Sequence, residues 1–147
     1  FILPPRRPML LFIYGTLKRG CYNHHYMDGQ RFLGTARTAP RYRLHNLGGY
    51  PGMVLAGSGN GNRSDGDNNN DPANPGLSIE GEVWDIDDAC RARLDILEGV
   101  EDGEYVLEPV PLLDEPFASQ LIQGYRYLRS TQGKPDIGPV WTEQPLK

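Results

Sequence analysis

The sequence Leu10-Leu11-Phe12-Ile13-Tyr14-Gly15-Thr16-Leu17-Lys18-Arg19-Gly20 places five apolar or aromatic residues directly before a glycine and then turns basic. The apolar run has the length of a strand and the aromatic and β-branched residues that favour one. Gly15 lets a ligand approach the main chain closely, and the N–H groups that follow it can face a carboxylate or a carbonyl oxygen, as backbone nests do. The stretch predicts either a buried strand that delivers a loop to a site, or a core strand that ends in a plain turn.

The composition favours a small soluble ligand. The 147 residues, 38% of them hydrophobic, suit one domain with its own core. The net charge of −4 and the lack of basic clusters argue against a nucleic-acid partner and against a polybasic membrane surface. No apolar run approaches the roughly 18 residues of a membrane span. Cys21 and Cys90 fit neither a metal motif nor a disulfide framework, so we expect free thiols in a cytoplasmic protein. The oligomeric state stays open between a monomer and a weak dimer.

Two segments differ from the expected domain, which spans residues 9–147. Residues 1–8 contain three prolines and no methionine, which is typical of an extended arm, a truncated upstream segment or a cloning remnant, and we expect Met9 to be the natural start. Residues 57–76 are rich in Gly, Asn, Asp and Ser and have too few apolar side chains to order themselves. We expect an exposed insertion at 57–76 between two strands of one sheet.

Several stretches have the pattern of strands, namely 32–37, 41–45, 53–56, 79–86, 105–113 and 121–129. We expect the first two to pair with each other. Pro109 and Pro111 limit 105–113 to an edge strand or a bulged strand, and the chain after Ser130 has no regular pattern. The expected fold class is α+β and mostly β, with a small curled or barrel-like mixed sheet flanked by one or two helices.

The clearest predicted helix ends beside a glutamate. Asp85 or Asp87 can cap its start, and Gly99 supplies its stop. Its apolar stripe consists of Ile86, Cys90, Leu94 and Leu97. Glu98 lies in the last turn, where the negative end of the helix dipole and partial burial both raise the pKa of a carboxyl. Such a glutamate suits proton transfer near neutral pH, and the alternative is a frayed surface side chain.

A second, short helix is expected at 24–27, with Asn23 as its cap. Its adjacent His24 and His25 point about 100° apart on a helix. We therefore expect packing or surface histidines rather than metal ligands.

Four motifs in order resemble the gamma-glutamyl cyclotransferase-like family, and most of all its gamma-glutamylamine cyclotransferase branch. They are Tyr14-Gly15-Thr16-Leu17-Lys18-Arg19-Gly20 with Asn23-His24, then Glu80-Gly81-Glu82-Val83-Trp84, then Leu94-Asp95-Ile96-Leu97-Glu98, then Tyr105. Their order and spacing match from about Met9 to Arg129. The resemblance implies a small β-barrel flanked by helices. It also implies an enzyme that releases 5-oxoproline and a free amine from a gamma-glutamyl amine or peptide, with no metal or organic cofactor.

The same resemblance assigns the site residues. Glu98 matches the catalytic glutamate, which acts as general base and acid. Tyr14, Gly15, Thr16 and Leu17 match the loop that holds the gamma-glutamyl group through its main chain, and Tyr105 and Tyr127 match aromatic positions near the pocket. The sequence departs from the branch at 57–76 and around Tyr50-Pro51-Gly52, which leaves the amine open.

Two hypotheses of other classes remain. One is a non-catalytic small-molecule-binding domain of the same fold. The other is a phosphate-binding loop, which the glycine spacing of Gly15 and Gly20 permits. The phosphate loop is disfavoured because Cys21-Tyr22 stands where its Lys-Ser/Thr pair belongs.

Overall fold

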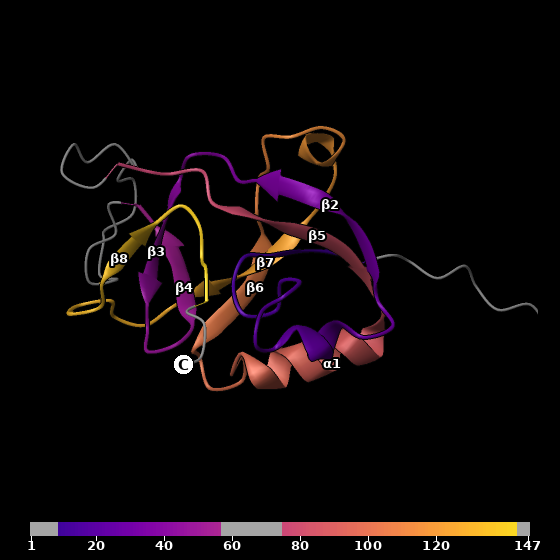
Figure 1. Cartoon of the computed structure of the whole chain (residues 1–147), viewed down its shortest axis with the longest axis horizontal. Coiled ribbons are helices and arrows are strands. Elements are labelled where there is room, and N and C mark those ends of the chain that lie inside the picture. The colour runs from indigo at the N-terminus through magenta and orange to yellow at the C-terminus, as the bar shows by residue number, and fades with distance from the viewer. Residues whose placement is uncertain (1–8, 57–74, 144–147) are drawn as a thin grey trace, which may run out of the picture.

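The computed structural model describes residues 9–56 and 75–143, whose strands form two sheets (Figure 1). The five-stranded sheet has the order β2-β5-β1-β7-β6, and the three-stranded sheet has the order β4-β3-β8. The strands are β1 (Met9–Ile13), β2 (Arg31–Arg37), β3 (Tyr42–Asn46), β4 (Pro51–Leu55), β5 (Glu80–Ile86), β6 (Tyr105–Pro109), β7 (Gln123–Tyr127) and β8 (Asp136–Gly138). The helices are α1 (Asp88–Leu97) and the short 3₁₀ helices η1 (His24–Met27) and η2 (Phe117–Ser119). The expected arm at 1–8 and residues 57–74 of the expected insertion lie outside the described residues.

Strand β1 consists of an unbroken run of apolar residues because both of its faces are buried. It pairs antiparallel with β5 and parallel with β7 in the middle of the larger sheet. Leu11 and Ile13 pack into one core cluster with Cys90 and Leu94 of α1. Phe12 packs into a second cluster with residues of the smaller sheet. Successive residues of a strand point to opposite faces, so β1 lies between the helix and the second sheet.

The predicted fold class is confirmed, since the larger sheet is mixed and the described residues contain eight strands and one α-helix. The closed β-barrel implied by the resemblance is wrong for the described strands. Strands β2 and β6 lie at opposite ends of the larger sheet and do not pair with each other, so this sheet stays open. The predicted edge position of 105–113 is confirmed, because β6 is an edge strand that ends at Pro109.

Three expectations about the strands are wrong. Strand β2 pairs with β5 and not with β3, because the connection is bound elsewhere: the Thr38 N–H donates to Ile79 O and the Ala39 N–H to Pro111 O. The strands on either side of 57–76, β4 and β5, belong to different sheets. The segment after Ser130 contains β8, which pairs with β3. A three-residue strand gives too few residues for a sequence pattern.

Helix α1 begins and ends as its sequence predicts. The Asp87 side chain accepts a hydrogen bond from Cys90 N at 2.7 Å, and Gly99 takes a φ of +66° just after the helix, which glycine allows without strain. Asn23 precedes η1 but makes no side-chain cap bond there, and its amide instead donates to Thr16 Oγ1. Within the described ranges, no helix combines the length and the apolar character that crossing a membrane requires.

Candidate active site

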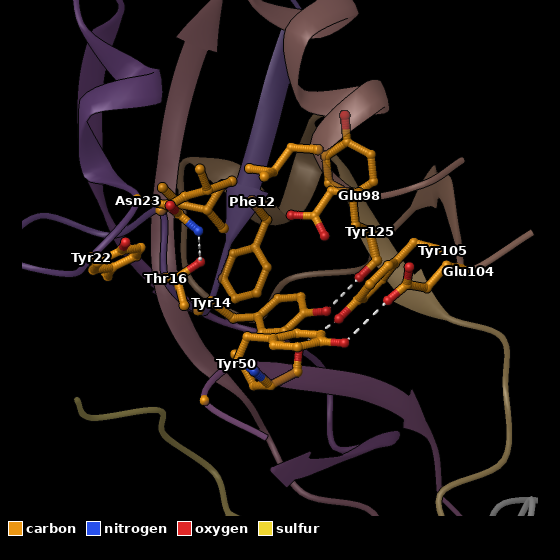
Figure 2. A pocket seen from close by; sticks show the side chains of 16 residues that line it. Phe12, Tyr14, Thr16, Tyr22, Asn23, Tyr50, Glu98, Glu104, Tyr105 and Tyr125 are labelled. Carbon is orange, nitrogen blue, oxygen red and sulfur yellow. Dashed lines mark hydrogen bonds between the residues drawn. The ribbon is translucent and has the colours of Figure 1, made fainter. Parts of the chain in front are cut away.

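A cavity of about 360 Å³ lies where the loop after β1, the end of α1 and the loop before β4 meet (Figure 2). Its volume falls within the range of small-molecule sites. The lining residues are Phe12, Ile13, Tyr14, Gly15, Thr16, Leu17, Tyr22, Asn23, Gly49, Tyr50, Pro51, Leu97, Glu98, Glu104, Tyr105 and Tyr125. The segments that build it are far apart in the sequence and are joined by the central strands.

The loop after β1 turns tightly at the cavity. Lys18 N donates to Gly15 O at 3.1 Å, and Asn23 N donates to Thr16 O at 2.8 Å. A Cβ atom on residue 15 would lie 2.6 Å from Pro51 Cγ, so the close approach of the two loops requires glycine. Among the described residues, none accepts a hydrogen bond from the N–H groups of residues 15–17. Three successive donors at a cavity wall can bind a carboxylate or a developing oxyanion.

Strand β5 holds the far side of this loop. Glu82 is buried and accepts from Arg19 N at 3.2 Å and from Arg19 Nε at 3.0 Å. Trp84 Nε1 donates to the same carboxylate at 3.1 Å. Gly81 makes room for the aromatic residue of β1, because a Cβ there would lie 2.6 Å from Phe12 Cζ. The Glu80–Trp84 motif therefore fixes the loop rather than entering the cavity.

Glu98 is the C-cap residue of α1, and its carboxyl points into the cavity (Figure 2). Burial and, to a smaller extent, the nearby Glu104 together raise the pKa of this carboxyl from its usual 4.5 to about 7. Among the described residues, none donates a hydrogen bond to the Glu98 carboxylate, so no such bond favours its ionised form. A carboxyl in this setting can take up and release a proton near neutral pH.

Tyrosines form a rigid wall around Glu98. The Tyr14 hydroxyl donates to Tyr125 O at 2.7 Å, and the Tyr105 hydroxyl donates to Pro51 O at 2.8 Å. The Tyr125 hydroxyl donates to Asp95 Oδ1 at 2.7 Å. Burial raises the pKa of all three phenols above its usual range. These hydroxyls are therefore neutral and already bonded, which suits them to hold the cavity's shape.

Six of the residues assigned from the sequence line this one cavity, namely Tyr14, Gly15, Thr16, Leu17, Glu98 and Tyr105. Tyr127, the seventh, is not among the lining residues. It lies behind Tyr105, with the two ring centroids 5.2 Å apart and nearly edge to face, and it packs against Gly52.

Sequence reasoning missed Glu104, which lines the cavity beside Glu98. It follows the turn that begins at Gly99, and its N–H donates to Gly99 O at 3.1 Å. The pair of glycines at 99 and 103 gave a signal for a tight turn, and such a turn returns residue 104 to the end of the helix. Within the described parts of the chain, no three His, Cys, Asp or Glu side chains gather in a way that could hold a metal ion.

The fold and the cavity define a small, mostly-β protein in which a glutamate and a row of main-chain donors line one cavity. A family model for gamma-glutamyl cyclotransferase, AIG2-like, matches residues 11–141. The chain is 38% identical over 117 residues to a Vibrio cholerae protein with the provisional name gamma-glutamylcyclotransferase. The aligned region covers 80% of this chain and 82% of that protein. The chain therefore belongs to the AIG2-like gamma-glutamyl cyclotransferase family.

Two further likenesses support the family and the fold. The Escherichia coli gamma-glutamylcyclotransferase family protein YtfP is 33% identical over 85% of this chain and 88% of its own. Its solution structure superposes with a TM-score of 0.58 over 90% of this chain and 95% of that one. A mouse AIG2-like protein, 21% identical, superposes with a TM-score of 0.62 over 97% of this chain and 99% of its own, which shows the shared fold.

Proposed function

We propose that this protein cyclises gamma-glutamyl amines or gamma-glutamyl peptides and releases 5-oxoproline and the free amine. Family membership supports gamma-glutamylcyclotransferase activity in general. The observation that carries the finer proposal is the placement of Glu98 in the same cavity as the free N–H groups of residues 15–17. One group can move a proton, and the others can hold an oxygen of the substrate.

The proton transfer is well matched to this carboxyl. The substrate's α-ammonium must lose a proton before its nitrogen attacks the γ-carbonyl carbon, and an α-amino group has a pKa of roughly 8. With its pKa raised to about 7, Glu98 comes within about one pH unit of that value. A carboxyl at the usual 4.5 would be a far weaker base. The ionised Glu98 therefore accepts this proton at little energetic cost.

Ring closure then needs no water. The α-nitrogen forms a bond to the γ-carbon, and negative charge develops on the γ-oxygen. The amides of residues 15–17 either stabilise this oxygen or orient the substrate's α-carboxylate, and both roles lower the barrier. When the bond to the leaving nitrogen breaks, Glu98 gives its proton to the departing amine. Glu98 then takes the second proton from the former α-nitrogen and passes it to the amine, which leaves as an ammonium ion. The products are 5-oxoproline and the amine, and Glu98 regains its starting charge.

The test is a panel of gamma-glutamyl amines and peptides, incubated with the protein and assayed for 5-oxoproline and amine. The proposal expects both products in equal amounts from at least one member. Binding of the panel without any turnover would instead support the alternative, a non-catalytic domain of the same fold.

Gly15 offers a test of the main-chain site. In the Gly15→Ala variant the new Cβ meets Pro51 at 2.6 and 2.9 Å, and the proline ring cannot rotate away as a flexible side chain would. We expect the loop to move and kcat/KM to fall by at least about tenfold, since a displacement of about 1 Å in a site can cost a hundredfold.

Steady-state kinetics on the best substrate of the panel checks this, with thermal unfolding of the variant as the control for overall folding. Unchanged kinetics in a folded variant would show that the loop does not touch the substrate.

A further inference from the structure

The cavity carries one more charge than the proposed reaction needs. Its lining includes two carboxyl groups, Glu98 and Glu104, and none of its sixteen lining residues is a lysine, arginine or histidine. Ring closure as proposed requires a single carboxyl to move the proton. A second acidic side chain in a partly closed cavity repels the first when both are ionised, so its presence calls for a role.

The backbone holds Glu104 beside the end of α1. Its N–H donates to Gly99 O at 3.1 Å, and its carbonyl accepts from Leu128 N at 2.9 Å. A Cβ on residue 99 would lie 3.0 Å from Glu104 Oε1, so this carboxyl lies directly over the residue that follows Glu98. On the other side, the Tyr50 hydroxyl lies 3.4 Å from Glu104 Oε2 as a donor. Two loops and a strand thus fix the position of this charge (Figure 2).

The other titratable groups that face Glu98 do not carry charge near neutral pH. They are the phenols of Tyr14, Tyr50, Tyr105 and Tyr125, from four different segments, and each has a raised pKa. Behind this wall, Asp95 accepts the Tyr125 hydrogen bond and lies 3.6 Å from Arg91 on the same helix. After burial itself, Glu104 is the group that raises the pKa of Glu98. Its charge therefore acts on Glu98 with little competition inside the cavity.

We propose that Glu104 is a positioning residue that acts through Glu98: its carboxylate, held in the same cavity, makes Glu98 a stronger base for the ring closure described above. This inference rests on the proposed function. It also separates the two glutamates by role, since Glu98 exchanges the proton and Glu104 supplies a fixed charge. A general base works best when its pKa lies near the working pH, and the Glu104 charge raises the pKa of Glu98 in that direction.

The experiment compares Glu104→Gln with wild type in two measurements. The first is kcat/KM against pH, whose acid limb reports the ionisation of the base in the free enzyme. The second is the titration of Glu98 itself by carbon NMR of protein labelled at the glutamate carboxyl. In the variant both midpoints should move to lower pH by about 0.5–1 pH unit. This is the pKa shift that a nearby like charge produces in a partly solvated site.

Two control variants give the result its meaning. Glu101→Gln removes an equal charge from the exposed part of the same turn, outside the cavity, and should leave both midpoints in place. Glu104→Asp keeps the charge and should restore most of the wild-type profile. A merely structural role of Glu104 would lower the rate without moving either midpoint.

The outcomes separate this inference from the proposed function. Turnover by wild type with unmoved midpoints in Glu104→Gln overturns the role of Glu104 and leaves the reaction intact. Absence of 5-oxoproline from every substrate overturns the reaction itself. In that case the NMR titration still tests the role of Glu104. An unchanged Glu98 midpoint in Glu104→Gln would show that the charge of Glu104 does not act on Glu98.

Discussion

Glu98→Gln is expected to release 5-oxoproline at least about a hundredfold more slowly than wild type, the low end of what a positioned general acid–base group contributes. The amide has the size of the carboxyl but cannot take a proton from the substrate's ammonium. Because the change leaves the cavity wall and the amides of residues 15–17 in place, the loss should fall on kcat more than on KM. Initial rates of 5-oxoproline formation at pH 8, with wild type as the reference, measure this loss of rate.

Glu101→Gln is the matched control for this comparison. It makes the same substitution about one turn away on the surface, and its rate should equal that of wild type. If Glu98→Gln were as fast as wild type, Glu98 would have no part in the proton transfer and the proposed mechanism would fail.

The Glu98→Gln substitution is also expected to stabilise the protein at alkaline pH. The pKa of Glu98 is about 7 in the folded state against a usual 4.5, so the folded state holds this proton more tightly than the unfolded state does. As pH rises from 4.5 to 7, the unfolded chain is already ionised while the folded one is not, and the free energy of unfolding falls. A tenfold difference in proton affinity is worth about 1.4 kcal/mol. Because solvent in the cavity screens part of the effect, we expect ionisation of Glu98 in the folded state to cost roughly 1–3 kcal/mol of stability.

Glutamine carries no charge, so Glu98→Gln avoids this penalty. Urea unfolding at pH 8 should show the variant more stable than wild type by about 1–3 kcal/mol, and the difference should vanish at pH 4.5, where Glu98 is protonated in the folded state. Titrating groups that do not interact with Glu98 are common to both proteins and cancel. A difference that stays constant between the two pH values would mean that Glu98 titrates in the folded protein as it does in a free peptide. Lost activity together with gained stability is the expected signature of a functional residue kept at a stability cost.

Local patterns in the sequence predicted the parts of the site that each lie within one segment. The run from Leu10 to Gly20 indicated a buried strand and a glycine turn, and the structure has β1 and that turn. The helix signals at Asp87 and Gly99 placed Glu98 at the end of α1, and the partial burial inferred for it agrees with its raised pKa. These features depend on neighbours a few residues apart, which a sequence displays directly.

Features that depend on long-range pairing were not predictable in the same way. Strand β2 has the pattern of a hairpin partner for β3, yet its hydrogen bonds go to β5, about fifty residues further along the chain. The expected barrel failed for the same reason, because closure depends on which edges meet. Asn23 looked like a helix cap, but Thr16 lies close enough to take its amide hydrogen bond instead. Glu104 was missed because its place in the cavity depends on the turn at Gly99, which brings it beside Glu98.

The most direct measurement is a crystal structure of the Glu98→Gln variant with a gamma-glutamyl amide bound, since this variant should hold the substrate without consuming it. The proposed mechanism requires the α-nitrogen to lie within hydrogen-bonding distance of the residue 98 side chain, with a carboxylate or carbonyl oxygen of the gamma-glutamyl group on the N–H groups of residues 15–17. A substrate bound outside this cavity, or one whose α-nitrogen points away from residue 98, would contradict it.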